Sequence, residues 1–592
     1  MPGLLTSSPQ PVSPQPVSLQ PRRLSMPQSG EFSIVDMLLR QQQETAVDRF
    51  SRRAPCTHGR EEETAPPEAR VYREPVPLNA PKEGEQYAFE VNLDSCTGCK
   101  ACVTACHNLN GLDEDELWRK VGLLSGGSSQ LPVIQHVSTA CHHCVEPACM
   151  EGCPVLAYEK DPITGIVRHL DDQCIGCQYC ILKCPYDVPR YSKKMGIVRK
   201  CDMCSSRLAV GEAPACAQAC PNEAIRIAVV NKEAVSAKAA ANLFLPGAPE
   251  PGYTKPATIY KTQKKLPANL LPADYWSVAP QHSHLPLVFM LVLTQMSAGA
   301  FLVERILVAS FPHGLENDGR NIHIAHVVAA LVIGLLGLNA SIFHLGRPLY
   351  AFRAFIGLRT SWLSREIVAF GGFAGLASAY AAAACAPLMG LTIPRQIEQV
   401  AGGAAALAGL VGVFCSVKIY ADTRRPFWDV LISGPKFFAT AILLGLPVAL
   451  SVALAATLFS HAGGLHAMMI AYGRLLCLWT LYVTLAKLAF EALIFVWLLR
   501  RQPTPLKRTA LLMTGELRKV TTLRFVCGAI GGVLLPAALL IEDRLTSSGY
   551  PSAMLAVVAL SIIVFLLAGE LLERYLFFTA VVAPKMPGSP AS

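Results

Sequence analysis

Sixteen of the 21 cysteines in this chain of 592 residues lie between Cys96 and Cys220, in four groups of four. The first and third groups have the spacing C-x2-C-x2-C-x3-C, and a proline follows the last cysteine of the second, third and fourth groups. Three closely spaced thiolates on a tight loop hold three irons of one [4Fe–4S] cluster, and the fourth reaches a neighbouring cluster. The spacing therefore predicts four [4Fe–4S] clusters. The predicted iron ligands are Cys96, Cys99, Cys102, Cys106; Cys141, Cys144, Cys149, Cys153; Cys174, Cys177, Cys180, Cys184; and Cys201, Cys204, Cys216, Cys220.

Zinc is the alternative metal for a cysteine-rich domain. Structural zinc sites use paired Cys-x2-Cys hooks with four ligands in all, rather than three cysteines in a row followed by a fourth. His142 and His143 lie inside the second quartet, which already has four thiols and needs no further donor. The pattern favours iron.

The second half of the chain has a different composition. Hydrophobic residues make up 52% of the chain and charged residues 16%. About 20 helical residues cross the core of a bilayer, so long apolar stretches predict membrane spans. The stretches are 284–308, 323–344, 366–386, 400–420, 437–459, 475–499, 520–541 and 553–577.

These elements exclude several classes of protein. The apolar stretches exclude a wholly soluble enzyme, and the clustered cysteines do not resemble the disulfide framework of a small secreted domain. The net charge of +9 comes mostly from short clusters that flank apolar segments, so we expect no nucleic-acid partner. The predicted fold is an α+β ferredoxin-like double dicluster domain followed by an all-α polytopic membrane domain of eight helices.

The predicted organisation has five parts. Residues 1–84 form a disordered, proline-rich extension with a short amphipathic helix near 33–53, and 85–235 form the cluster domain. Residues 236–283 are a linker, 284–580 the membrane anchor and 581–592 a tail. Proline-rich segments of this kind cannot bury enough apolar surface to offset the entropy of ordering.

The cysteine-rich region resembles a known family. With CIGCQYC, CPYDVPRY and KCDMC, residues 85–230 are similar to the four-cluster electron-transfer subunit of the dimethyl sulfoxide reductase family of molybdoenzymes. The resemblance implies that quartets exchange their fourth cysteines. The implied ligand sets are Cys96, Cys99, Cys102 with Cys220; Cys201, Cys204, Cys216 with Cys106; Cys141, Cys144, Cys149 with Cys184; and Cys174, Cys177, Cys180 with Cys153.

The membrane half resembles the eight-helix anchor subunit of the same system. The similar stretches are NASIFHLGRPLYAFRAF (339–355), WLSREIVAF (362–370) and LLAGELLERYLF (566–577). The chain thus looks like two normally separate subunits fused in order. The resemblance implies quinol, expected to be menaquinol, as electron donor, and a separate catalytic subunit that alone carries molybdopterin.

Three residues form the predicted quinol site. His344 ends the second span and Glu366 begins the third, so both face the side of the cluster domain. Quinol releases two protons with its two electrons, and a histidine is suited to accept one. Arg347 is placed to steady the quinolate, and Glu366 to pass the proton to water. The resemblance also places the site at His344. Should His344 not be the proton acceptor, Glu366 and Glu570 are the next candidates. The alternative is that His344 caps the helix or binds a lipid headgroup.

No haem is expected. Two haem-binding histidines must face each other across helices, whereas His323 and His326 lie at the other end of the second span from His344. Lys487 and Glu491 lie deep in the sixth span at an i,i+4 spacing and are expected to neutralise each other. The alternative hypothesis is that this pair forms part of a proton path.

Charge predicts the orientation. Segments 345–365, 421–436 and 500–519 contain 13 Lys and Arg residues, whereas the loops at the opposite side contain five. The positive-inside rule places the first set, and the cluster domain with it, in the cytoplasm at the inner membrane. No apolar export signal follows the N-terminus, and this agrees with a cytoplasmic cluster domain. Docking of the cluster domain or of a partner would also account for the basic loops.

Together these features predict a multi-pass membrane protein that oxidises quinol and relays electrons to a reductase subunit, without a substrate-reducing site of its own. The expected partners are that subunit, the quinone pool and membrane lipid. Two alternatives remain. The same relay could run in reverse, from a dehydrogenase or hydrogenase to quinone, or the cysteines could form a metal-sensing module that controls an eight-helix permease.

Overall fold

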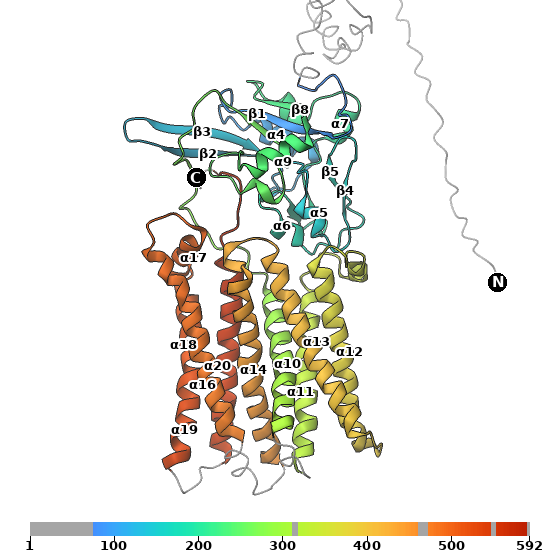
Figure 1. The fold of residues 1–592 in the computed structure, drawn as a ribbon, viewed down its shortest axis with the longest axis vertical. Coiled ribbons are helices and arrows are strands. Elements are labelled where there is room, and N and C mark those ends of the chain that lie inside the picture. The colour runs from blue at the N-terminus through green and yellow to red at the C-terminus, as the bar shows by residue number, and fades with distance from the viewer. Residues whose placement is uncertain (1–74, 311–317, 460–471, 546–551, 589–592) are drawn as a thin grey trace, which may run out of the picture. The chain divides into compact units, whose positions relative to one another are not determined.

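The computed structural model describes residues 75–310, 318–459, 472–545 and 552–588. The described residues belong to one compact unit, Arg70–Ser592. The predicted helix at 33–53 lies outside the described residues. Within this unit, they form an α+β cluster domain packed on one end of a helical membrane bundle (Figure 1).

Two small sheets and two hairpins build the cluster domain. One sheet has the order β8-β1-β9 and the other β10-β2-β3, and the hairpins are β4-β5 and β6-β7. β1 pairs antiparallel with β8 and parallel with β9. The strands are β1 (Glu85–Asn92), β2 (Lys120–Gly127), β3 (Pro132–Thr139), β4 (Tyr158–Lys160), β5 (Val167–His169), β6 (Arg190–Ser192), β7 (Ile197–Arg199), β8 (Ile225–Asn231), β9 (Ile259–Lys261) and β10 (Leu271–Pro272).

The helices of the cluster domain are short and follow the cysteine loops. Most of them hold only one or two turns, because they must leave a loop at one quartet and enter the next. They are α4 (Ala101–Asn110), α5 (Ala148–Glu151), α6 (Tyr179–Lys183), α7 (Ser205–Ala209), α8 (Ala215–Gln218), α9 (Lys232–Ala240) and the 3-10 helix η1 (Pro251–Tyr253).

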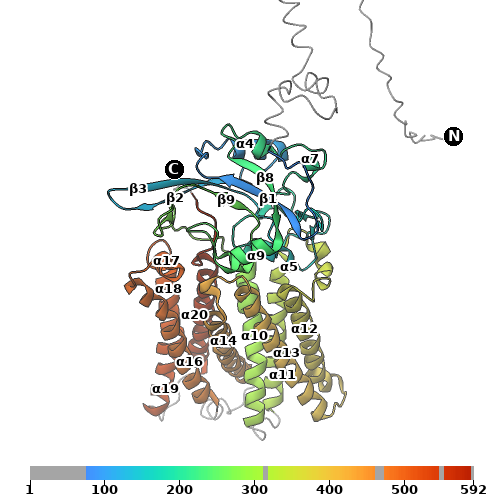
Figure 2. The ribbon, with the colours of Figure 1, turned by 45° about the horizontal axis from the view of Figure 1, so that its top comes forward.

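The segment after α9 returns to the cluster domain before it enters the membrane bundle. Its strands β9 and β10 complete the two sheets, so much of the predicted linker is part of the folded domain. The tail after the last helix does the same. The Leu123 N–H donates to the Gly588 carbonyl over 3.2 Å, and Met586 is buried in the core of the cluster domain. Both views of the ribbon show this tail rising from the bundle (Figure 2).

Among the described residues, seven helices are long and apolar enough to cross a membrane. They match the first seven predicted spans, and α20 packs among them as the eighth helix of the bundle. The helices are α10 (Leu285–Ser310), α11 (Asp318–Ile342), α12 (Trp362–Cys385), α13 (Arg395–Ala421), α14 (Val430–Phe459), α16 (Arg474–Ala492), α18 (Arg518–Ala529), α19 (Leu535–Leu545) and α20 (Ser552–Thr579). Shorter elements are η2 (Pro348–Phe355), η3 (Ala386–Met389), η4 (Pro426–Trp428), η6 (Leu493–Leu499), α17 (Pro505–Thr514) and the π-helix η7 (Ile530–Leu534), which joins α18 to α19.

Small residues bring the helices of the bundle close together. A Cβ atom at Gly299 of α10 would lie 1.7 Å from the carbonyl oxygen of Ala441 in α14. Only glycine fits at such a crossing. This is the close packing that the Gly- and Ala-rich composition of the spans predicts for helices in lipid.

Candidate functional site: cysteine quartets above a histidine pair

The cysteine loops turn tightly because several of their residues adopt left-handed backbone conformations. In the first quartet Gly98 and Lys100 have φ of +75° and +65°, and in the third Gly176 and Gln178 have φ of +70° and +60°. Each pair directs the chain into a helix, α4 or α6, that carries the next cysteine. The two quartets with identical spacing therefore share one local fold.

Backbone N–H groups donate to the last cysteine of two quartets. The Ala157 N–H lies 3.2 Å from the Cys153 sulfur, and the Ala224 N–H lies 3.2 Å from the Cys220 sulfur. In each case the cysteine is followed by proline and the donor comes four residues later. Such hydrogen bonds favour the thiolate, which is the form that binds metal.

The first and fourth quartets lie together. Cys96, Cys99 and Cys102 line one cavity with Cys220. Cys106, by contrast, faces the other three cysteines of the fourth quartet. Burial and the neighbouring thiols of Cys216 and Cys204 raise the pKa of Cys106 to about 12.

The second and third quartets are interleaved in the same way. Burial, followed by the thiols of Cys184 and Cys141, raises the pKa of Cys149. Burial, followed by the thiol of Cys153, likewise raises the pKa of Cys177. The structure thus brings together the four sets of thiols that the family resemblance implies.

Among the described residues, no three His, Cys, Asp or Glu side chains converge closely enough to hold one metal ion.

Two buried cations also fit negatively charged clusters. Arg119 is 1% exposed, and within the described part of the chain its Nε and Nη2 have no hydrogen-bond partner. Burial lowers the pKa of Arg119, but the thiols of Cys216 and Cys102 outweigh this effect and raise it above its usual value. Lys200 is similarly buried beside Cys141. An unpaired buried charge is costly, and thiolate-bound iron–sulfur clusters would offset that cost at both residues.

The four sets follow one another across the domain. Cys201 lies near Cys141, so the set that contains Cys201 adjoins the set that contains Cys141. Tyr158 lies near both Cys149 and Cys180, so it lies between the set that contains Cys149 and the set that contains Cys180, which faces the bundle. At the far end of the series Cys99 is exposed.

His344 lies directly after α11, where the bundle meets the cluster domain. Its Nε2 is 3.2 Å from the carbonyl oxygen of Cys177. Because a carbonyl only accepts, Nε2 is the donor and Nδ1 is left as the acceptor of the ring. Burial lowers the pKa of His344 to about 4, so the imidazole is neutral near pH 7. A neutral hydrogen-bond acceptor thus lies beside a predicted iron ligand.

His284 is a second histidine at this place, and the sequence reasoning missed it. The two imidazole rings lie 5.1 Å apart between centroids, and Phe578 of α20 lies 5.6 Å from His284. Among the described residues the buried Nδ1 of His284 has no partner. The available signal was the sequence His282-Ser283-His284 immediately before the first span.

The other two predicted quinol-site residues make different contacts. The Arg347 guanidinium donates to the Asp171 carbonyl over 2.8 Å. Glu366 is buried in the first turns of α12 and accepts a hydrogen bond from Ser416 of α13. Within the described residues, neither side chain is hydrogen-bonded to His344. The structure brings Arg347 to the cluster domain and Glu366 into the bundle.

The predicted pair Lys487 and Glu491 belongs to a larger network. Lys487 contacts Glu491 over 3.2 Å and also binds Glu570. Arg524 lies 2.9 Å from Glu491 and 2.8 Å from Glu570. Two cations and two carboxylates from α16, α18 and α20 therefore form a closed, alternating ring, which we call the charge ring. All four are buried.

The histidines at the far end of the bundle have carboxylate and backbone partners. His323 lies 3.0 Å from both Glu304 and Glu398. His326 lies 2.9 Å from the Ala300 carbonyl. Both imidazole rings therefore have hydrogen-bonding partners within the bundle.

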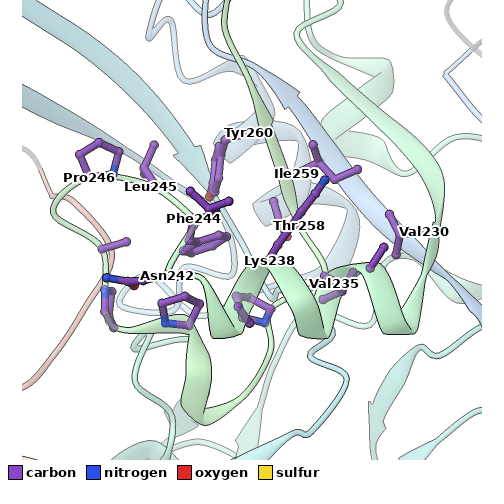
Figure 3. A pocket seen from close by; sticks show the side chains of 18 of the residues that line it. Val230, Val235, Lys238, Asn242, Phe244, Leu245, Pro246, Thr258, Ile259 and Tyr260 are labelled. Carbon is purple, nitrogen blue, oxygen red and sulfur yellow. The ribbon is translucent and has the colours of Figure 1, made fainter. Parts of the chain in front are cut away.

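A cavity of about 890 Å³ lies between α9 and the segment that follows it (Figure 3). Phe244, Tyr260 and Pro246 form its apolar wall, with Lys238 from α9. No cysteine or histidine lines it among the residues that the structure describes. Its lining residue Thr258 lies 2.9 Å from Nδ1 of His142, which follows Cys141 in the sequence.

Two family models match the chain. Residues 133–230 match "4Fe-4S dicluster domain", which covers the second, third and fourth quartets. Residues 280–580 match "DMSO reductase anchor subunit (DmsC)". The second match covers just over half of the sequence and all eight helices of the bundle.

Several iron–sulfur subunits of other proteins are similar to the cysteine-rich part. The B subunit of the anaerobic dimethyl sulfoxide reductase of Haemophilus influenzae is 33% identical over 189 residues, which is 30% of this chain and 91% of the relative. The B subunit of the same reductase in Escherichia coli K12 is 36% identical over 148 residues, 24% of this chain and 72% of the relative.

A third relative comes from a different enzyme. The iron–sulfur subunit of the nitrate-inducible formate dehydrogenase of Escherichia coli K12 is 32% identical over 169 residues, 25% of this chain and 57% of the relative. The cysteine-rich part is thus similar to electron-transfer subunits, and the rest matches the anchor. With both parts in one polypeptide, this protein belongs to the DMSO reductase anchor subunit family, as a fusion of the anchor with an iron–sulfur subunit.

Proposed function

We propose that this chain oxidises quinol where its membrane bundle meets the cluster domain, and supplies the electrons to a separate molybdopterin-containing reductase subunit. The contact of His344 Nε2 with the Cys177 carbonyl carries the proposal. It joins a candidate proton acceptor in the bundle to a predicted iron ligand. The names of the relatives, subunits of anaerobic dimethyl sulfoxide reductases, support the reductase partner.

The chemistry needs two protons and two electrons to leave quinol. His344 presents Nδ1 as the acceptor for one hydroxyl proton, and His284 presents a second imidazole beside it. Glu366 is the proposed relay for a released proton, with Ser416 as its hydrogen-bond partner. Arg347 donates to the Asp171 carbonyl and so ties the segment after α11 to the cluster domain. When bound, [4Fe–4S] clusters supply one-electron carriers.

The partner is expected to bind around Cys99. This cysteine is exposed, whereas the other end of the series of quartets is covered by the bundle. Electrons that enter beside Cys177 therefore have their exit at the surface near Cys99. A catalytic subunit with an electron acceptor near its own surface fits that place.

A second candidate function reverses the flow, from a dehydrogenase into quinone. The similarity to a formate dehydrogenase iron–sulfur subunit favours it. The two candidates differ in the potentials of the clusters. Redox titration of the purified complex decides between them: clusters with potentials above that of the membrane quinol accept its electrons, whereas clusters well below it deliver electrons to quinone.

The proposal of four clusters predicts the metal content of the chain. Anaerobically purified protein is expected to contain about 16 iron and about 16 acid-labile sulfide per chain, because each of four sets of thiols holds one [4Fe–4S] cluster. Colorimetric iron and sulfide assays measure both. Half of this content would leave at least one quartet with another role. Cys177→Ser is expected to damage the cluster next to His344 and interrupt transfer from the bundle.

We also propose that the cluster domain faces the cytoplasm at the inner membrane. The excess of Lys and Arg in the loops on its side supports this orientation. Arg347, Arg353 and Arg425 of those loops donate to carbonyls of the cluster domain, and Arg424 and Arg508 lie over the rings of Tyr253 and Tyr275. The remaining eight basic residues still outnumber the five on the opposite side.

A reporter fused after Ser592 tests the orientation. The tail packs on the cluster domain through Gly588, so the reporter lies on the same side as the clusters. A reporter that is active only in the cytoplasm is expected to be active, and alkaline phosphatase at the same position is expected to be inactive. Alkaline phosphatase activity would contradict the orientation and leave the electron-transfer proposal intact.

A further inference from the structure

A groove of about 490 Å³ lies between η6, α17 and α18, and it shares no residue with the candidate quinol site. Arg518, at one end of it, is the first residue of a candidate membrane span. The groove therefore begins where the bundle leaves the apolar core of a membrane. Its lining residues are Phe495, Met513, Thr514, Arg518, Thr521, Thr522, Phe525, Val526 and Ala529.

The lining of the groove is polar at one end and apolar at the other. Thr514, Arg518 and Thr521 lie at the end of α17 and in the first turn of α18. Phe525 and Ala529 follow along α18, whose 12 residues span about 18 Å of helix axis. This gradient matches a molecule with a polar head at the membrane surface and an apolar body within it.

Two polar side chains in the groove have no protein partner. Thr521 is 6% exposed, and within the described part of the chain its hydroxyl makes no hydrogen bond. Arg518 is exposed and, among the same residues, its guanidinium makes no hydrogen bond or ion pair. A buried hydroxyl usually has a partner. A ligand with acceptor oxygens would serve both side chains.

The surroundings of the groove are positively charged. Residues 500–519 contain six Lys and Arg residues against one acid, Glu516. The N-terminus of α18, which has 12 residues and no side-chain cap, also lies at the polar end. Helix N-termini favour anions because their first N–H groups are unsatisfied.

The apolar surface continues from the groove along the outside of the bundle. Leu523 and Val526 of α18 are 51% and 44% exposed. Large apolar side chains that are exposed on a membrane span face lipid. A ligand held at Arg518 can therefore extend acyl chains over Val526 without leaving the bilayer.

We propose that this groove is a binding site for one anionic phospholipid. Its phosphate accepts hydrogen bonds from Arg518 and Thr521 at the start of α18, and its acyl chains lie against Phe525 and Val526. Basic pockets at this depth bind anionic headgroups in membrane proteins. A free anion would fill the polar end and leave the apolar half of the groove unused.

Such a lipid would support the contact between the bundle and the cluster domain. α17 forms one wall of the groove, and its Arg508 lies over the Tyr275 ring at 4.4 Å. Tyr275 belongs to the segment between β10 and α10. A lipid that holds α17 in place therefore also holds this segment.

Native mass spectrometry of the full chain, purified with its catalytic partner and exchanged into phosphatidylglycerol, tests the site. The variants are Arg518→Glu and Thr521→Val, and the matched control is Arg501→Glu, which makes the same charge change in the same basic segment outside the groove. Visible absorbance of the clusters checks that each variant has folded.

One tightly retained phosphatidylglycerol is expected in the wild type and in R501E. R518E is expected to lower its retention about tenfold or more, because a charge-assisted hydrogen bond is lost. T521V removes only a hydroxyl, so lower retention without loss of thermal stability supports the contact. Equal retention in wild type and R518E would overturn the proposal. So would an equal loss in R501E, or displacement of the lipid by inorganic phosphate at equal concentration.

Discussion

His344→Ala is expected to lower the rate at which a quinol analogue reduces the bound clusters by about 100-fold or more. The variant removes the ring nitrogen that is left to accept a proton when Nε2 donates to the Cys177 carbonyl. The cysteine loops do not depend on this side chain, so the clusters are expected to assemble. Stopped-flow absorbance under anaerobic conditions measures the rate, and dithionite measures the total reducible cluster.

His344→Gln separates proton acceptance from folding. Glutamine keeps an amide N–H that can donate to the Cys177 carbonyl, but its oxygen is a far weaker base than imidazole. We therefore expect it to be nearly as slow as the alanine variant with quinol, and normal with a soluble reduced dye. Wild-type rates in both variants would move the site elsewhere, with Glu366 and Glu570 as the next residues to test.

Glu570→Gln is expected to destabilise the membrane bundle by about 3–5 kcal/mol, because it breaks a buried ion-pair network by removing one partner. Glu570 accepts hydrogen bonds from Thr440, Lys487 and Arg524. Without its charge, the two cations of the charge ring share the single carboxylate of Glu491. The expected result is a lower midpoint of thermal unfolding in detergent.

A second substitution tests the cause. Lys487→Met in the Glu570→Gln background restores the balance of charges, and it should recover part of the lost stability. Glu516→Gln, at an exposed carboxylate, is the control and should leave the midpoint unchanged. If Glu570→Gln is as stable as the wild type but loses oxidation of quinol, the charge ring would be assigned to proton transfer instead.

The cysteines were the part of the site that sequence could predict best. A cluster imposes its spacing on the chain locally, and the tight loops at Gly98 and Gly176 follow from that spacing. The exchange of fourth cysteines could not be read from spacing, because Cys106 and Cys216 are more than 100 residues apart. That prediction came from family resemblance, and the positions of the thiols support it.

The membrane spans were predictable for a similar reason, since hydrophobicity over some 20 residues is a local property. The charge ring was not. Lys487 and Glu491 share one helix and were found by their i,i+4 spacing, whereas Arg524 and Glu570 come from other helices. Only the packing of the bundle brings the four side chains together.

His284 shows the same limit at the candidate quinol site. It lies 60 residues before His344 in the sequence, and only the packing of the start of α10 against the end of α11 joins them. For Arg347, closeness in sequence pointed to a contact that the described part of the chain does not show. Its closeness in sequence to His344 suggested a role toward quinol, but its guanidinium donates to the cluster domain.

The most direct test of the electron-transfer proposal is anaerobic reduction of the clusters in the purified wild-type complex by a menaquinol analogue. We expect the visible absorbance of the clusters to bleach with quinol alone, and adding the substrate of the catalytic partner should then reoxidise them. Clusters that dithionite reduces fully but quinol leaves oxidised would contradict the account, as would reduced clusters that pass their electrons only to quinone.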